Sequence, residues 1–177
     1  MSVKLLNSPR RVWLGIVLVC LGLLSFGMYL QHVVGLEPCP MCIVQRYAMV
    51  LMALVALIGA FVSARVGTLM VGGSLVLLAE GGAYVAARQS WLQWNPPEAV
   101  SCGRDFYGMI ETFPLKQAIP MIFKGSGDCS KVDWTFLGGS IANWSFVVFL
   151  VMGTVALVTT LRVLRPQSMA VQASSEA

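Results

Sequence analysis

VWLGIVLVCLGLLSFGMYL, residues 12–30, contains no charged side chain and is long enough to cross a lipid bilayer. A helix needs about 20 apolar residues to span the hydrocarbon core. Three more stretches have the same character, although the third carries Glu80. We therefore predict four spans, at Val12–Leu30, Tyr47–Ala64, Val66–Ala87 and Ile141–Leu161. The spans must be helical because lipid offers no hydrogen-bond partner to the peptide backbone.

The composition supports the same class. Of 177 residues, 57% are hydrophobic and 11% are charged, against about 25% charged in ordinary soluble domains. So few charges cannot cover a water-soluble surface, which excludes a soluble globular enzyme, a disordered chain and, despite the net charge of +4, a nucleic-acid binder. We predict an all-α integral membrane protein with one four-helix domain, residues 1–165, and a flexible tail, residues 166–177.

The distribution of basic residues predicts the orientation in the membrane. The first span lacks the cleavage-site pattern of a signal peptide, so we expect it to be retained as a helix. Four spans then place both termini on one side. That side carries basic residues close to helix ends, which by the positive-inside rule makes it cytoplasmic. The outward loops would be residues 31–46 and the long segment 88–140 between the third and fourth spans.

Four of the five cysteines fall on the outward side. The fifth, Cys20, lies inside the first span, where a cysteine usually acts as a small apolar residue. Cys39-Pro40-Met41-Cys42 is a C-x-x-C motif that allows three interpretations. A structural disulfide closes too small a loop to stabilise much. A zinc site could use all four outward cysteines, but four-cysteine zinc sites usually have two short C-x-x-C pairs, and Cys102 and Cys129 are far apart in the sequence. A redox-active pair fits best, since strained, exposed disulfides are the labile ones.

The position of the motif favours redox chemistry. Cys42 lies at or just before the N-terminus of the second span, where the helix dipole stabilises an anion. Arg46 follows one turn deeper on the same face. Both groups favour the thiolate, which is the reactive species. Arg46 could instead be an interfacial residue whose long side chain reaches the headgroups.

The long loop holds the second cysteine pair. Cys102 and Cys129 have glycine-rich surroundings that suggest accessible cysteines, so two disulfides could exchange by thiolate attack. The alternative is one structural disulfide within the loop. Aromatic and aliphatic residues from Phe106 to Phe113 recur at helical spacing and predict a short amphipathic helix on the membrane surface.

The electrons from such a pair need an acceptor. The chain has no nucleotide-binding or CxxCH motif and one histidine, His32. The acceptor must then be a partner protein or a lipid-soluble carrier. A quinone meets this need, with Arg46 stabilising negative charge on its ring oxygen.

Several motifs resemble one family. Pro38-Cys39-x-x-Cys42-Ile43-x-x-Arg46 is similar to the corresponding segment of the bacterial disulfide-bond formation protein B (DsbB) family. The resemblance extends from about Trp13 to Leu161 and includes four other segments: Phe113-Pro114, Ile119-Pro120-x-Ile122-Phe123, Ser126-Gly127-Asp128-Cys129 and Trp134-x-Phe136-Leu137-Gly138.

This resemblance implies a mechanism. A reduced DsbA-like periplasmic thiol oxidase would attack a Cys102–Cys129 disulfide, and Cys39 would exchange with that loop pair. Cys42 would then pass electrons, beside Arg46, to ubiquinone or menaquinone, and the quinol would feed the respiratory chain of the bacterial inner membrane. The DsbA couple lies near about −120 mV, which a quinone can oxidise and a nicotinamide cannot.

Two polar residues of the third span lack a clear assignment. Some family members have a histidine thirteen residues before the first loop cysteine, where this chain has Gln89, which can hydrogen-bond a quinone carbonyl but cannot carry a proton. Glu80 is a candidate because ionisable groups inside membranes are costly. Gly72, Gly73, Gly81 and Gly82 are expected to permit close helix packing.

Two other classes of protein remain as alternatives. One is a relative of vitamin K epoxide reductase, which also couples cysteines to a quinone, although its quinone-proximal C-x-x-C comes late in the chain. The other is a non-enzymatic metal-binding or scaffold protein with four spans.

Overall fold

The computed structural model describes residues 8–96, 130, 132 and 134–164. This part of the chain forms four long helices and one small hairpin: α1 (Pro9–His32), α2 (Pro40–Phe61), α3 (Arg65–Trp94), β1 (Thr135–Phe136), β2 (Gly139–Ser140) and α7 (Ile141–Leu164). All four helices are long and apolar enough to cross a membrane. The prediction of an all-α, four-span membrane protein is confirmed.

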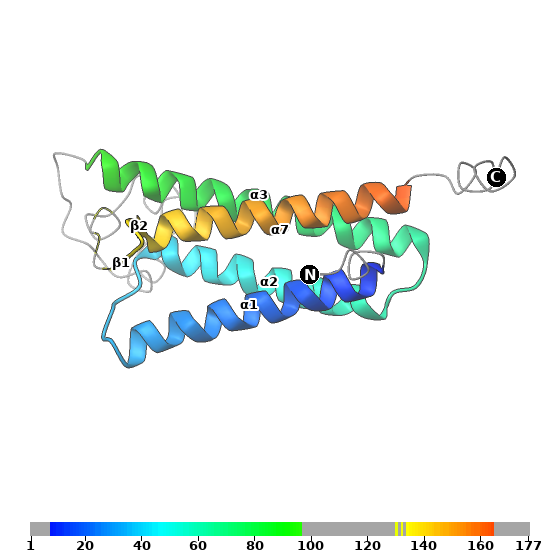
Figure 1. Ribbon diagram of the computed structural model, residues 1–177, viewed down its shortest axis with the longest axis horizontal. Helices are drawn as coiled ribbons and strands as arrows, with labels where there is room; N and C mark the ends of the chain where they lie inside the picture. Colours follow the sequence, from blue (N-terminus) through cyan, green and yellow to red (C-terminus); the bar gives the residue numbers. More distant parts are fainter. Residues whose placement is uncertain (1–7, 97–129, 131, 133, 165–177) are drawn as a thin grey trace, which may run out of the picture.

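The helices form an elongated bundle in which successive helices run in opposite directions (Figure 1). α3 packs along α7 and against α2, and α2 packs along α1. The start of α1 and the end of α7 lie at one end of the bundle. The hairpin, the α1–α2 connection and the start of α2 lie together at the opposite end (Figure 1).

At this second end, α1 continues two residues past its expected span, to His32, and two other helices extend further. α2 begins at Pro40 rather than Tyr47, because the fixed φ of proline suits the first helical position. Cys39, which precedes the proline, is kept extended at φ −66° and ψ 161° and forms the N-cap. α3 continues past Ala87 to Trp94 and ends just before Pro96. Part of each expected outer loop is therefore helical. An apolar run identifies the residues inside the hydrocarbon core, whereas a helix can continue for several polar residues beyond it.

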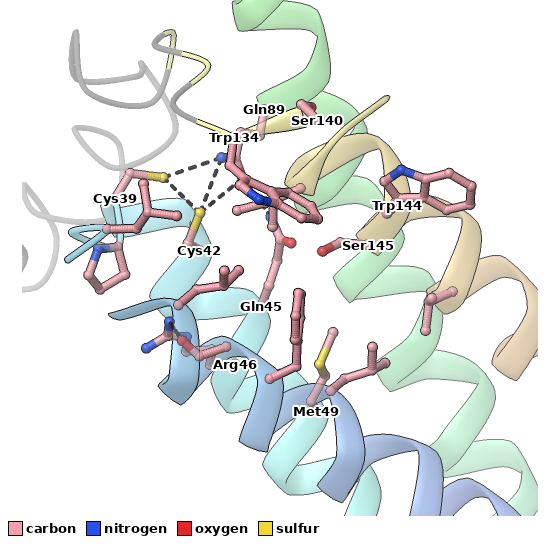
Figure 2. A pocket seen from close by; sticks show the side chains of 18 of the residues that line it. Cys39, Cys42, Gln45, Arg46, Met49, Gln89, Trp134, Ser140, Trp144 and Ser145 are labelled. Atoms are coloured by element: carbon pink, nitrogen blue, oxygen red, sulfur yellow. Dashed lines mark hydrogen bonds between the residues drawn. The ribbon is translucent and has the colours of Figure 1, made fainter. Parts of the chain in front are cut away.

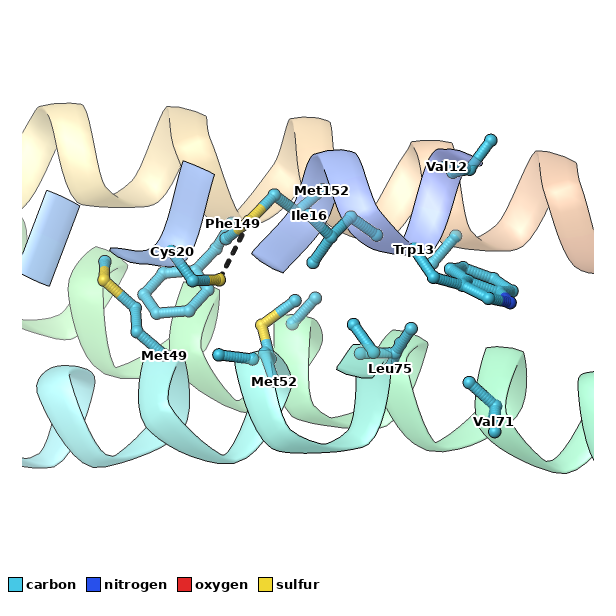
Figure 3. Close-up of a cluster of buried hydrophobic side chains, with 14 of the residues drawn as sticks. Val12, Trp13, Ile16, Cys20, Met49, Met52, Val71, Leu75, Phe149 and Met152 are labelled. Carbon is cyan, nitrogen blue, oxygen red and sulfur yellow. Dashed lines mark hydrogen bonds between the residues drawn. The ribbon is translucent and has the colours of Figure 1, made fainter. Parts of the chain in front are cut away.

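The core lies along the middle of the bundle (Figure 3). Trp13, Cys20, Met52, Leu75 and Phe149 are completely buried. The Cys20 Sγ donates a hydrogen bond to the sulfur of Met152 on α7 at 3.8 Å. Cys20 therefore packs as a small side chain of the core, as its position in the sequence indicated.

Glycines permit the close approach of α3 and α7 at two positions. A Cβ at Gly82 would collide with the ring of Phe149, and one at Gly72 would collide with Thr160. Gly73 and Gly81 face open space instead. The expected packing role therefore holds for Gly72 and Gly82 but was wrong for the other two.

A two-stranded hairpin leads directly into α7. Phe136 pairs with Gly139, and the two residues between them, Leu137 and Gly138, have φ of 49° and 80°. Positive φ at both turn positions is the geometry that two-residue hairpin loops prefer. The indole of Trp144 on α7 donates to the Phe136 carbonyl at 2.9 Å, which fastens the hairpin to the bundle.

Candidate functional site

The C-x-x-C motif lies at the N-terminus of α2. Cys39 is the N-cap, and Cys42 lies in the first turn. Their Sγ atoms are 3.1 Å apart, with Cys39 buried and Cys42 half-buried. Unpaired N–H groups at a helix N-terminus favour negative charge, so this position suits a cysteine that must become a thiolate.

Gln89 reaches the two sulfurs from α3. Its Nε2 donates to Cys39 Sγ at 3.3 Å and to Cys42 Sγ at 3.2 Å (Figure 2). The side chain is 4% exposed, so these hydrogen bonds have little competition from solvent. They depend on the continuation of α3 beyond Ala87, which carries Gln89 alongside the start of α2.

Arg46 lies one turn after Cys42 on α2 and is held against α1. Its Nη1 donates to Gln31 Oε1 at 2.5 Å, and its Nη2 donates to the Gly27 carbonyl at 3.0 Å. Arg46 is half-buried. Two contacts with α1 therefore set the position of this cation.

A cavity of about 610 Å³ connects these groups. Most of its wall is apolar, and Glu37 and Arg46 are the charged side chains among the described residues that line it. Aromatic rings line one side, with Trp134 5.9 Å from Phe26 and stacked 6.0 Å from Phe136, centroid to centroid. The lining includes Leu23, Leu30, Gln93 and Val148. Figure 2 labels other lining residues, among them Cys39, Cys42, Gln45, Arg46, Met49, Gln89 and Ser145.

The shape and chemistry of this cavity suit a flat apolar molecule with polar groups at its edge. The volume falls within the range of small-molecule sites, which combine apolar walls with a few polar groups. Arg46 can donate hydrogen bonds to a ligand oxygen, and Cys42 can exchange electrons with the ligand. No other arrangement in the described residues brings a cysteine pair to a cavity of this kind.

Several predicted residues lie outside the described residues. These are Cys102, Cys129 and the segment expected to form a surface helix, Phe106 to Phe113. Within the described part, no group of three His, Cys, Asp or Glu side chains could hold a metal ion. The alternative of a zinc site that uses all four outward cysteines stays untested, as does the pairing of Cys102 with Cys129.

Glu80 lies away from this site. It is exposed on the outer face of α3 and does not line the cavity.

Three residues that contact the site residues were not predicted from the sequence: Gln45, Gln31 and Gly27. Gln45 follows Cys42 by three residues and so shares its helix face, a signal that was available. Gln31 and Gly27 act on Arg46 only through the packing of α1 on α2.

Exposed tryptophans surround this end of the bundle. Trp91 and Trp94 on α3 and Trp144 on α7 are 57%, 70% and 39% exposed. Tryptophan gathers at membrane–water interfaces. Arg65, at the opposite end, donates to the Leu164 carbonyl at 2.8 Å. This pattern places the cysteine pair near one surface of the membrane.

Fold and site together define a multi-pass membrane protein with a cysteine pair at the start of its second span. The family model described as "Disulfide bond formation protein DsbB" matches residues 9–159. The chain belongs to the DsbB family, whose members act in disulfide-bond formation.

Curated relatives agree with this assignment. Disulfide bond formation protein B of Polaromonas naphthalenivorans (strain CJ2) is 67% identical, over 93% of this chain and 99% of the relative. The protein of the same name from Albidiferax ferrireducens is 70% identical, over 86% of this chain and 88% of its own length. The protein from Azoarcus sp. (strain BH72) is 49% identical over 88% and 94% of the two chains.

Proposed function

We propose that this protein is a thiol:quinone oxidoreductase that reoxidises a DsbA-like periplasmic thiol oxidase and passes the electrons to ubiquinone or menaquinone. The quinol would then deliver them to the respiratory chain, which sustains disulfide-bond formation. One observation carries the proposal: a single, mostly apolar cavity is lined by both Cys42 and Arg46. A pair of cysteines that served only as a structural staple would need neither the cavity nor the cation.

The residues present fit a quinone. A quinone supplies a two-electron acceptor that takes up two protons and dissolves in lipid. The apolar walls suit its ring, Arg46 can donate to a ring oxygen, and Trp134 offers an aromatic face beside the cavity. An Arg fixed before the reaction stabilises developing negative charge without reorganisation.

The electrons follow two disulfide exchanges. A thiolate of the reduced DsbA-like partner attacks the Cys102–Cys129 disulfide, and the partner leaves with its own cysteines joined. The reduced loop pair then attacks the Cys39–Cys42 disulfide, which reoxidises the loop and leaves Cys39 and Cys42 as a dithiol. Re-forming the Cys39–Cys42 bond releases two electrons and two protons, which convert the quinone to quinol.

The proposed location is the bacterial inner membrane, with both termini in the cytoplasm. One feature supports this orientation: the ends of α1 and α7 that lie closest to the termini carry Arg10, Arg11 and Arg162, as the positive-inside rule expects of a cytoplasmic side. Cys39 and Cys42 would then face the oxidising periplasm, where disulfides persist.

A reconstituted assay tests the proposal. The full-length protein in lipid nanodiscs is mixed with a reduced DsbA-like oxidase and a short-chain ubiquinone, and the loss of quinone absorbance is followed. We expect turnover in the wild type, none in Cys42→Ser, and wild-type turnover in Cys20→Ala, whose sulfur lies in the core. No quinone reduction by the wild type, together with stoichiometric bound zinc, would support the metal-binding alternative.

A further inference from the structure

A second glutamine, Gln45, contacts the glutamine that faces the cysteine pair. Gln45 Nε2 on α2 donates to Gln89 Oε1 on α3 at 2.7 Å. Both side chains are 4% exposed. A short hydrogen bond between two buried amides on different helices holds both amides in one orientation, because a buried polar group without its partner is costly.

The orientation of the Gln89 amide decides what the sulfurs meet. A primary amide has a donor end and an acceptor end. Because Gln45 donates to Oε1, the Nε2 end lies closest to Cys39 and Cys42, at 3.3 and 3.2 Å. Oε1 also accepts a longer hydrogen bond, 3.7 Å, from the thiol of Cys42. Ionisation of Cys42 removes that donor and leaves Nε2 as the group that supports the sulfur. Turned by 180°, the same amide would place its oxygen instead of its Nε2 closest to both sulfurs and would disfavour a thiolate. Hydrogen-bond donation to the charged form of a group favours that form.

We propose that Gln45 is a positioning residue: by donating to Gln89 Oε1, it keeps the Gln89 Nε2 donor on the sulfur of Cys42 and so stabilises the Cys42 thiolate. This inference rests on the proposed function and adds a residue to it. Gln45 acts through Gln89.

The remaining polar surroundings explain why an amide can have this influence. The described cavity lining has Glu37 in the α1–α2 connection and Cys39, Cys42 and Arg46 at and within the start of α2 as its titratable or charged groups. The α3 residues of the lining, Gln89 and Gln93, are neutral, and those of α1, α7 and the hairpin carry no charge. Since neither glutamine titrates, their support of the thiolate does not change with pH.

The test measures thiolate formation directly, without quinone or partner. The reduced full-length protein in nanodiscs is alkylated with iodoacetamide over a range of pH, and modification of Cys42 is read by peptide mass spectrometry. Only the thiolate reacts. In Gln45→Met, which keeps the side-chain length but has no donor, we expect about three- to tenfold slower alkylation of Cys42 at neutral pH. In Gln45→Glu, which can accept from Gln89 but not donate while ionised, we expect a larger decrease.

A double-mutant cycle separates positioning from packing. In a Gln89→Leu background, Gln45→Met should have no further effect on the alkylation rate. An equal effect with and without Gln89, or no effect of either Gln45 variant in protein that keeps wild-type thermal stability, would overturn the proposal. Asn143→Asp, an amide-to-acid change on α7 outside the cavity lining, should leave the profile unchanged.

Failure of the proposed function would look different. If the wild type reduced no quinone while the alkylation cycle gave the expected coupling, the positioning role would stand and the electron acceptor would have to be reassigned.

Discussion

Arg46 on α2 is fastened to Gln31 on α1 by a hydrogen bond of 2.5 Å between Nη1 and Oε1. The only cation in the described lining of the cavity is therefore positioned by a neighbouring helix. The packing of α1 against α2 therefore affects the group proposed to stabilise the quinone oxygen. This effect can be tested without changing the cysteines.

Replacing Gln31 with Ala should weaken quinone reduction. A hydrogen bond to a charged group contributes about 1.5–3 kcal/mol, and the Gly27 carbonyl still holds the guanidinium. We expect kcat/KM for the quinone to fall about tenfold. Steady-state kinetics at varied quinone concentration measure this. The adjacent exposed residue provides a matched control: His32→Ala should behave like the wild type.

Replacing Arg46 itself with Ala should have a larger effect, about a hundredfold on kcat/KM for the quinone, in line with the loss of one donor at a site of developing charge. Disulfide exchange between the partner and the loop cysteines, followed by trapping the mixed disulfide, should be nearly unchanged. Equal loss of both activities would instead indicate a folding defect.

Trp134 should contribute to quinone affinity rather than to the rate of electron transfer. Its ring stacks on Phe136 and lies beside the cavity, and an aromatic contact contributes about 0.5–1.5 kcal/mol beyond area burial. We expect Trp134→Ala to raise KM for the quinone about five- to tenfold with kcat largely retained. Leu137→Ala, at the 81% exposed tip of the same hairpin, should leave KM unchanged, and an equal rise in both variants would contradict a direct contact.

The contact between α3 and α7 at Gly82 should tolerate no larger side chain. A Cβ there would collide with Phe149, which is completely buried and cannot move aside. Overpacking of this kind costs about 1–3 kcal/mol, so Gly82→Val should lower the unfolding temperature in detergent. Gly81→Val, one residue along and facing open space, should have little effect.

Much of this fold could be predicted from the sequence, because an apolar run of about 20 residues with few charges predicts a membrane-spanning helix. The start of α2 at Pro40 was missed, because the predicted span began at Tyr47, although proline suits the first helical position. The hairpin Thr135–Ser140 was not predicted, since strands of two residues have no periodicity and Leu137-Gly138 is an unusual turn pair. The last turns of α3 were missed because their polar residues resemble a loop.

The candidate site was predictable only along single helices. Cys39, Cys42 and Arg46 share one end of α2, so their spacing alone brings them together. Gln89 could be named from the resemblance, but its contact with the two sulfurs depends on how α3 packs against α2. The support of Arg46 by Gln31 likewise joins residues on different helices, and no pattern within one segment reveals it.

Replacing Glu80 should change how favourably α3 inserts into the membrane without changing quinone reduction. It lies midway along α3 on the face turned away from the other helices, and a charged residue at the centre of a spanning helix costs about 2.5–3.5 kcal/mol in insertion assays. Glu80→Leu should make insertion of α3 more favourable by about 2–3 kcal/mol in such an assay. Quinone reduction should stay at the wild-type level; a loss of activity in stably inserted protein would give Glu80 a role in proton uptake.

The N-terminal boundary of α2 falls between the two cysteines of the motif, so their backbones differ in conformation. Cys39 belongs to the extended chain before Pro40, whereas Cys42 is built into the first turn of a rigid helix. Because Cys39 precedes the helix, disulfide exchange at Cys39 would require no unwinding of α2, whereas displacement of Cys42 would. Pro40 thus separates a cysteine at the helix boundary from a cysteine within the helix, and we expect the loop pair to exchange with Cys39 and the quinone to react with Cys42.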